Sequence, residues 1–182
     1  MNGDSCIRLA YDAIFQGDFE AAVHWFGQAI ELEPDNAEYY FRGSITCARS
    51  GKHVQAMDYA KRAADLNPGE PSYRLHLRML LARERFAEAR RLLSQTEPDV
   101  GRGVALLQEA VQLDPLSAQA KLLLGIAYRA QRKYDLAQDC LRDALQLDPG
   151  LGEARKWLGE IRAERRRLLK QQYSHYHSKR NR

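Results

Sequence analysis

One six-residue phrase recurs four times in the sequence, and its spacing constrains the fold more than any other feature. The phrase reads alanine, two further residues, leucine, a polar residue and proline, and its copies are residues 29–34, 63–68, 110–115 and 144–149. Pro34 and Pro68 are as far apart as Pro115 and Pro149, whereas the gap between the two pairs is longer and is not a multiple of that interval. We call the shared interval the repeat period. A period of about 34 residues predicts stacked helix–turn–helix units, here with an interruption in the middle of the array.

The first unit contains the signals that such a helix pair needs. Gly17 can adopt the left-handed conformation that ends a helix, and the carboxylate of Asp18 can cap the next one. Pro34 ends the pair because proline cannot sit inside a helix. The apolar face of the second helix recurs at steps of three and four residues, through Phe19, Ala22, Val23, Phe26, Ala29 and Ile30.

Small residues at matching places make the chain resemble a tetratricopeptide repeat (TPR) protein over roughly residues 4–161. The family's glycine position is matched by Ala10, Ser44, Gly125 and Gly159. Its alanine position, which begins the packing face of the second helix, is matched by Ala22, Ala56, Ala89 and Ala137. The resemblance implies an all-α fold, a right-handed α-solenoid of stacked TPR repeats with an irregular middle and a C-terminal capping helix.

The sequence predicts four segments. Residues 4–95 hold about two and a half to three TPR units, and residues 96–149 hold an extra or degenerate helix plus one well-formed unit. Residues 150–172 form a capping helix, and residues 173–182 form a basic, disordered tail.

The middle of the array has two interpretations. Residues 71–82 and 86–95 look like a helix pair, and Thr96 then looks like the cap of a further helix. Either an extra helix lies between the third and fourth units, or residues 86–96 double as a shortened first helix. The residues do not decide between these alternatives.

Composition places the chain among folded proteins of a reducing compartment. Of its 182 residues 45% are hydrophobic, yet no apolar run approaches the roughly 20 residues that span a bilayer. The N-terminus lacks the features of a secretory signal, and the three cysteines are far apart. We therefore expect a cytoplasmic protein with free thiols.

No motif for catalysis is present. The sequence has no glycine-rich phosphate loop, no metal-ligand cluster and no nucleophile motif, and His175 and His177 alone make a weak metal site. We expect no enzyme activity, no cofactor and no metal.

The resemblance implies that a partner protein binds in a concave groove lined by the first helices of the units. Carried over to this sequence, the groove-lining candidates are Arg8, Tyr11, Phe15, Phe41, Arg42, Arg49, Arg74, Arg78 and Arg129. Arginines among aromatic residues favour an apolar, acidic segment of a partner, because arginine pairs with carboxylates and aromatic rings supply contact area. The sequence thus predicts a non-catalytic adaptor or scaffold.

One specialisation of the family is not expected here. TPR co-chaperones that hold the C-terminal carboxylate of heat-shock chaperones use a set of Lys, Asn, Asn, Lys and Arg. The corresponding positions in this chain are Ile7, Tyr11, Arg42, Pro71 and Leu75. None keeps the required residue, so this partner is not predicted.

The end of the chain suggests two alternatives. Residues 162–182 contain eight basic residues and one acid, a net charge of +7, so residues 1–161 carry −3. Such a tail can attract nucleic acid, ribosome or an anionic surface weakly. Its candidate residues are Arg165, Arg166, Arg167, Lys170, Lys179, Arg180 and Arg182. The other alternative is a homo-oligomer in which Trp157 and Leu168 of the terminal helix meet their copies.

Overall fold

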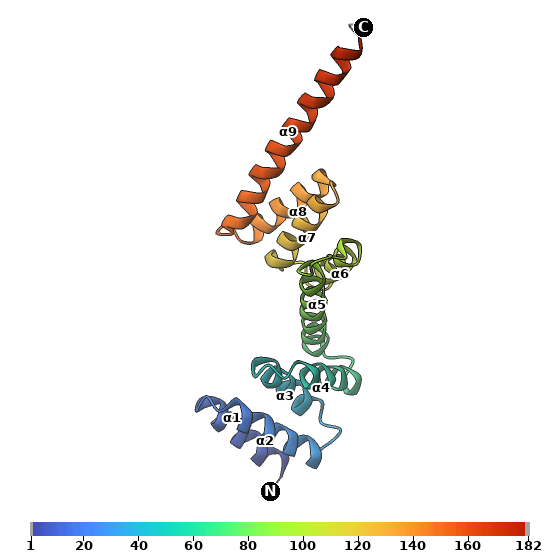
Figure 1. Cartoon of the computed structure of the whole chain (residues 1–182). Coiled ribbons are helices and arrows are strands. Elements are labelled where there is room, and N and C mark those ends of the chain that lie inside the picture. The colour runs from blue at the N-terminus through green and yellow to red at the C-terminus, as the bar shows by residue number, and fades with distance from the viewer. Residues whose placement is uncertain (1, 181–182) are drawn as a thin grey trace. The chain divides into compact units, whose positions relative to one another are not determined.

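A computed structural model describes the backbone of residues 2–180 and the side chains of residues 2–171. In this part of the chain all regular structure is α-helical, which agrees with the predicted all-α class. The chain divides into two compact units, Met1–Leu81 and Ala82–Arg182, and one helix, α5, contributes to both (Figure 1).

The first unit begins with two helical hairpins. Helices α1 (Gly3–Phe15) and α2 (Phe19–Leu32) form the first, and α3 (Ala37–Arg49) and α4 (His53–Leu66) form the second. The turn glycines Gly17 and Gly51 both have left-handed backbone conformations, with φ of 78° and 80°. The Asp18 carboxylate accepts a hydrogen bond of 2.9 Å from the amide of Ala21, so the predicted turn and cap are confirmed.

The core of the first unit lies where these hairpins stack. Phe26 of α2 is 1% exposed and packs in one cluster with Cys6, Ala10 and Tyr39 from α1 and α3. Small residues at the hairpin contacts allow the helices to approach closely. At Ser44, for example, the buried hydroxyl donates a hydrogen bond of 2.7 Å to the carbonyl of Ala56 in α4.

The middle of the chain differs from the predicted helix pair. Residues 71–82 and 86–95 belong to a single helix, α5 (Pro71–Leu93). Arg85 stands one repeat period after the turn glycine Gly51, and residues 83–85 are all good helix formers without a breaker. The guanidinium of Arg85 also forms a 3.0 Å ion pair with Glu109 of the following helix.

The second half of α5 acts as a first helix for α6 (Val100–Leu113). This is closer to the second interpretation of the sequence, although no separate helix begins at residue 86. Ala89 was predicted to begin the packing face of a second helix, but it lies inside the continuous α5, where it is fully buried. That assignment was wrong. Gly103, one repeat period before Ala137, holds that position instead, and Leu93 packs against it. The cap of α6 is Asp99, which accepts a 2.9 Å hydrogen bond from the amide of Arg102, and not Thr96.

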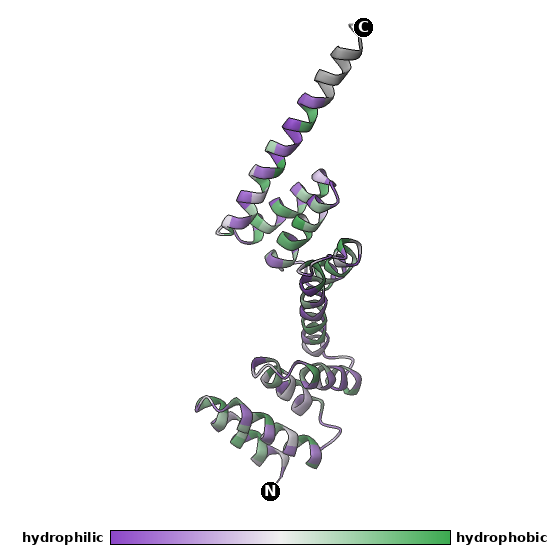
Figure 2. Cartoon of the chain, in the orientation of Figure 1, coloured by the Kyte–Doolittle hydropathy of each residue, from purple (hydrophilic) through white to green (hydrophobic). Residues whose placement is uncertain are grey.

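The second unit continues with the hairpin of α7 (Ala118–Ala130) and α8 (Tyr134–Leu147) and ends with α9 (Gly152–Arg180). Leu107, Leu141 and Ile161 are fully buried in its core. Figure 2 shows hydrophobic residues where α7 and α8 lie beside each other. The first turns of α9 cover α8 through Leu158 and Ile161, as expected of a capping helix.

Helix α9 continues past residue 172, the predicted boundary of the tail, to Arg180. The continuous α5 also moves the division between the units to residues 81 and 82, whereas the sequence placed a boundary at residues 95 and 96. Within the part of the chain that was searched, no helix is both long enough and apolar enough to cross a bilayer.

Candidate functional site

The first helices of the first unit present matching side chains at intervals of one repeat period. We call this surface, on α1, α3 and the first half of α5, the first-helix face. Its residues occupy three repeat positions: Ile7, Phe41 and Leu75 at the first; Tyr11, Ile45 and Met79 at the second; and Phe15 and Arg49 at the third. Phe15 is 94% exposed, and Tyr11, Leu75 and Met79 are 40–50% exposed. The face is therefore largely apolar and in part open to solvent.

Two of the predicted residues, Tyr11 and Arg42, lie together across the α1–α3 contact. The guanidinium of Arg42 donates a 2.7 Å hydrogen bond to the Tyr11 hydroxyl and lies 5.4 Å from the centre of its ring. Arg42 also forms an ion pair with Glu38, one turn earlier on α3. Because Glu38 already balances its charge, Arg42 mainly fastens α3 to α1.

Phe41 links α3 to α5. The centre of its ring lies 4.7 Å from the ring centre of Tyr73 and 5.5 Å from that of His76, which it meets edge to face. The Ser44 hydroxyl gives its only proton to Ala56, so it accepts the 2.8 Å hydrogen bond from Nε2 of His76. Burial raises the pKa of Tyr73, and the charges of Glu38 and Glu70 add to this effect. These contacts fix the first half of α5 on the second hairpin.

The other predicted arginines of the first unit, Arg8, Arg49, Arg74 and Arg78, are exposed. None forms an ion pair with a described residue. Arg49 belongs to the first-helix face. Arg74 and Arg78 stand at a different repeat position, one repeat period after Tyr40 and Ser44, where the earlier first helices contact their second helix.

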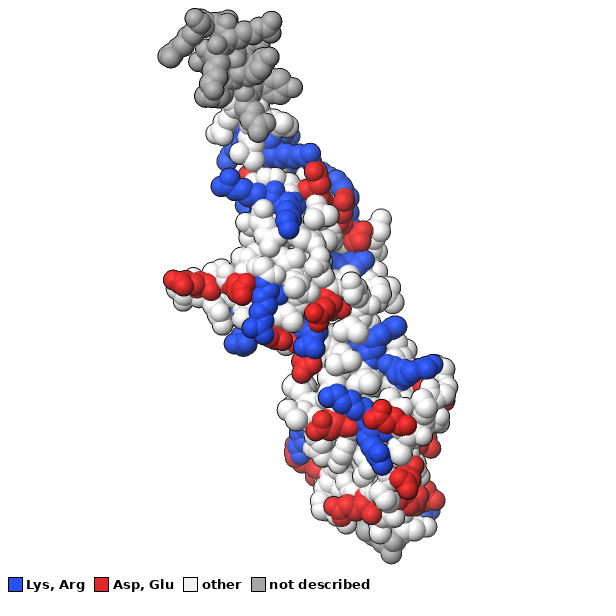
Figure 3. All heavy atoms as spheres, turned by 90° about the vertical axis from the view of Figure 1, so that its right-hand side faces the viewer, with Lys and Arg blue, Asp and Glu red and all other residues white. Residues whose placement is uncertain are grey.

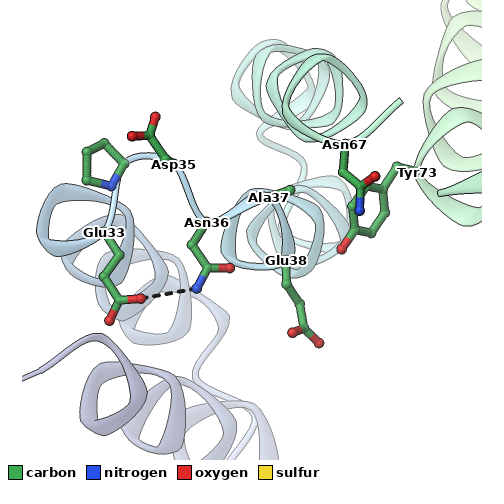
Figure 4. A pocket seen from close by; sticks show the side chains of 8 residues that line it. Glu33, Asp35, Asn36, Ala37, Glu38, Asn67 and Tyr73 are labelled. Carbon is green, nitrogen blue, oxygen red and sulfur yellow. Dashed lines mark hydrogen bonds between the residues drawn. The ribbon is translucent and has the colours of Figure 1, made fainter. Parts of the chain in front are cut away.

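A pocket of about 610 Å³ lies beside the connection between α2 and α3 (Figure 4). Its lining contains three carboxylates and two amides but no basic side chain: Glu33, Pro34, Asp35, Asn36, Ala37, Glu38, Asn67 and Tyr73. Asn36 donates a 3.1 Å hydrogen bond to Glu33 within it. Sequence reasoning missed this pocket, although the acids clustered around Pro34 were visible. Acidic groups of a partner are disfavoured there.

Arg129 lies in the second unit, in a contact between α7 and α9. Its guanidinium pairs with Glu164 at 3.2 Å and Glu160 at 3.7 Å, and it stacks over the Trp157 ring at 4.8 Å. A hydrogen bond from Tyr134, followed by the contacts with Arg129, lowers the pKa of Glu164. Arg129 thus helps to hold the capping helix, and it covers the Trp157 ring proposed for homo-oligomer contacts.

Basic side chains gather on the described part of α9 (Figure 3). Arg165, Arg166, Arg167 and Lys170 are all exposed, and Arg165 forms a 2.6 Å ion pair with Asp135 of α8. The side chains of Lys179 and Arg180, and the whole of Arg182, lie outside the described residues.

The three cysteines are free thiols. Cys6 and Cys47 are buried, and burial raises the pKa of the Cys47 and Cys140 thiols to about 11. The Cys47 and Cys140 thiols are therefore protonated at neutral pH, which disfavours their reaction as nucleophiles. Among the residues searched, no group of three or more His, Cys, Asp or Glu side chains is arranged to hold a metal ion.

Comparison with solved structures shows similarity to TPR proteins. The chain matches the crystal structure of MamA protein with a TM-score of 0.56 and 19% identity, covering 92% of this chain and 86% of that one. At this identity the match shows the fold alone.

Two curated relatives share sequence with the chain. The TPR repeat-containing protein YpiA of Bacillus subtilis is 28% identical over 81% of this chain and 31% of its own length. The tetratricopeptide repeat and J domain-containing co-chaperone DNJ1 of Cryptococcus neoformans is 29% identical over 46% of this chain and 16% of its own. The chain spans less than a third of the length of the curated relatives it matches.

A family model described as tetratricopeptide repeat matches residues 7–71, 99–150 and 122–171, which together make up most of the chain. These are the regions in which the hairpins and the repeat period occur, and the unmatched residues 72–98 contain most of the continuous helix α5. The chain belongs to the tetratricopeptide repeat family, whose fold in general serves protein–protein interaction.

Proposed function

We propose that this chain is a non-catalytic adaptor that binds an apolar segment of a partner protein along the first-helix face of the first unit. The observation that carries the proposal is the exposure of large apolar side chains there, above all Phe15 at 94%. An exposed aromatic residue among further apolar side chains is typical of an interaction surface. The TPR family also binds partners through its first helices, which supports the same surface.

The partner segment carries an acidic residue that pairs with Arg49. Arg49 stands at the same repeat position as Phe15, one unit further along the array, and has no ion pair among the described residues. Arg42 does not contribute a free charge, because it is paired with Glu38. The segment is mainly apolar, since the pocket at Glu33 to Glu38 repels further acids.

The proposal does not extend to the C-terminal carboxylate of chaperones. DNJ1 is named a co-chaperone, but it matches less than half of this chain. The five positions that hold such a carboxylate in TPR co-chaperones carry other residues here, and two of them, Tyr11 and Arg42, bond to each other.

The test compares partner capture by variants of the full chain in lysate of the native host. Phe15→Asp and Met79→Asp place a carboxylate on the first-helix face. Val54→Asp is the matched control, because Val54 is 79% exposed but lies on α4, the second helix of its hairpin and not part of the first-helix face. We expect the wild type and Val54→Asp to capture the same proteins, and both face variants to lose them while keeping their helix content.

Two results would contradict the proposal. One is capture that survives Phe15→Asp and Met79→Asp in correctly folded protein. The other is capture that is abolished by Arg167→Gln combined with Lys170→Gln on α9. The second result would transfer the function to the basic tail.

A further inference from the structure

Helix α9 matches the first helix of a repeat, and among the described residues no second helix packs against it. Comparison with α7 shows which surface this leaves open. Gly125 of α7 lies directly under α8. A Cβ atom added to Gly125 would lie 2.8 Å from Cγ of Leu141 and 3.1 Å from the carbonyl oxygen of Ala137. The absence of a side chain at this position therefore allows α8 to pack against the backbone of α7.

Gly159 stands one repeat period after Gly125, at the same repeat position of α9. A Cβ atom added there would meet no atom within 4 Å, apart from its own helix and chain neighbours. Arg155, Arg162 and Arg166 lie on the same side of the helix, at spacings of three and four residues. We call these four residues the open face of α9.

The open face is basic and adjoins a pocket. Arg162 and Arg166, together with Arg165 and Leu169, line a pocket of about 320 Å³ against Gln138 of α8. No carboxylate lines this pocket, and Leu169 is 47% exposed at its edge. Arg162 and Arg166 have no ion pair among the described side chains.

The α7–α8 hairpin indicates which charge belongs opposite this face. Lys121 of α7 forms a 3.2 Å ion pair with Asp143 of α8. Arg155 stands one repeat period after Lys121, but no described helix follows α9 to supply the acid. Arg155 instead donates a hydrogen bond to the carbonyl of Pro149. A helix placed on α9 as α8 is placed on α7 would bring an acidic residue to Arg155.

We propose that the open face of α9 binds one acidic, amphipathic helix of a partner protein, in the place that α8 occupies on α7. The bound helix presents a small residue and a leucine four positions later to Gly159, as α8 presents Ala137 and Leu141 to Gly125. Its carboxylates pair with Arg155, Arg162 and Arg166. This site is separate from the first-helix face and does not depend on the function proposed for that face.

The sequence of α8 provides a probe. A synthetic peptide of residues 133–149 with Cys140→Ser has four acidic and two basic residues and the packing residues described above. It is titrated into the full-length, ¹⁵N-labelled protein, and the backbone amides are followed by NMR. We expect saturable shifts of the amides around Gly159 and Arg162, and weaker binding of the peptide that carries Asp143→Asn.

Matched variants of the protein separate this site from nonspecific attraction. Gly159→Leu fills the place of the bound helix and should weaken peptide binding at least about tenfold. It keeps the fold, because the site is empty and leucine is a better helix former than glycine. Lys156→Leu on another side of α9 is its control and should leave the affinity unchanged. Arg155→Glu with Arg162→Glu should also abolish binding, whereas Arg167→Glu should not.

Four results would overturn the proposal. The first is an absence of amide shifts at the highest soluble peptide concentration. The second is equal affinity of Gly159→Leu and wild type, and the third is shifts centred on Gly125, which would mean that the peptide displaces α8. The fourth is association of the protein with itself, measured by light scattering and abolished by Gly159→Leu. That result would make a second copy the occupant.

Discussion

Replacing Glu84 by proline tests whether α5 is one helix across residues 83–85. Glu84→Pro removes the amide hydrogen that bonds to the carbonyl of Leu80, and the proline ring collides with the same carbonyl. In a helix interior, proline lowers the free energy of unfolding by about 3 kcal/mol or more relative to alanine. This loss is larger than the roughly 1 kcal/mol that even glycine causes there. For a chain of this length 3 kcal/mol corresponds to about 6–12 °C in Tm.

The control variant is Glu84→Ala. The side chain of Glu84 makes only a 3.9 Å ion pair with its neighbour Arg85, so its removal should change the free energy of unfolding by less than about 0.5 kcal/mol. Urea unfolding followed by circular dichroism measures all three proteins. If the free energies of unfolding of Glu84→Pro and Glu84→Ala differ by less than about 1 kcal/mol, residue 84 does not lie inside a helix and α5 is not continuous.

Three further predictions concern the packing and the charges. Gly125→Ala should destabilise the protein by about 1–3 kcal/mol, because its Cβ would collide with α8. Gly159→Ala should stabilise it by about 0.5–1 kcal/mol. If Gly125→Ala and Gly159→Ala changed the free energy of unfolding equally, Gly159 would not lie on an open face. Phe26→Ala should cost about 3–5 kcal/mol in urea unfolding, and a loss below about 1 kcal/mol would contradict its burial. The lowered pKa of Glu164 stabilises the fold above pH 4.5, and this contribution is lost as the pH falls through the lowered value. Between neutral and strongly acid pH, the Tm of Glu164→Gln should therefore fall by less than the Tm of the wild type.

The regular repeats could be predicted from the sequence because their signals are local. Gly17 and Asp18 end one helix and begin the next at adjacent positions, and the repeat period fixes which helices are equivalent. The middle could not be predicted in the same way. There the repeat period places a turn at Arg85, whereas the residues around it favour a helix, and the structure has a continuous helix.

The candidate site was predicted only in part, because several arginines form internal contacts. The pairing of Arg42 with Glu38 could have been anticipated, since the two residues stand one turn apart on one helix. The pairing of Arg129 with Glu164 joins α7 to α9 and depends on how α9 packs. The sequence pointed to the open face of α9 only through Gly159, which stands one repeat period after Gly125.

Partners are proposed to contact the first-helix face. Site-specific photo-crosslinking tests this contact most directly, with a photoreactive phenylalanine analogue at Phe15 in one protein and at Val54 in another. Both positions are exposed, but only Phe15 lies on the face. We expect host proteins to crosslink at Phe15 and not at Val54. Crosslinks at Val54 alone, with none at Phe15, would contradict the proposed contact.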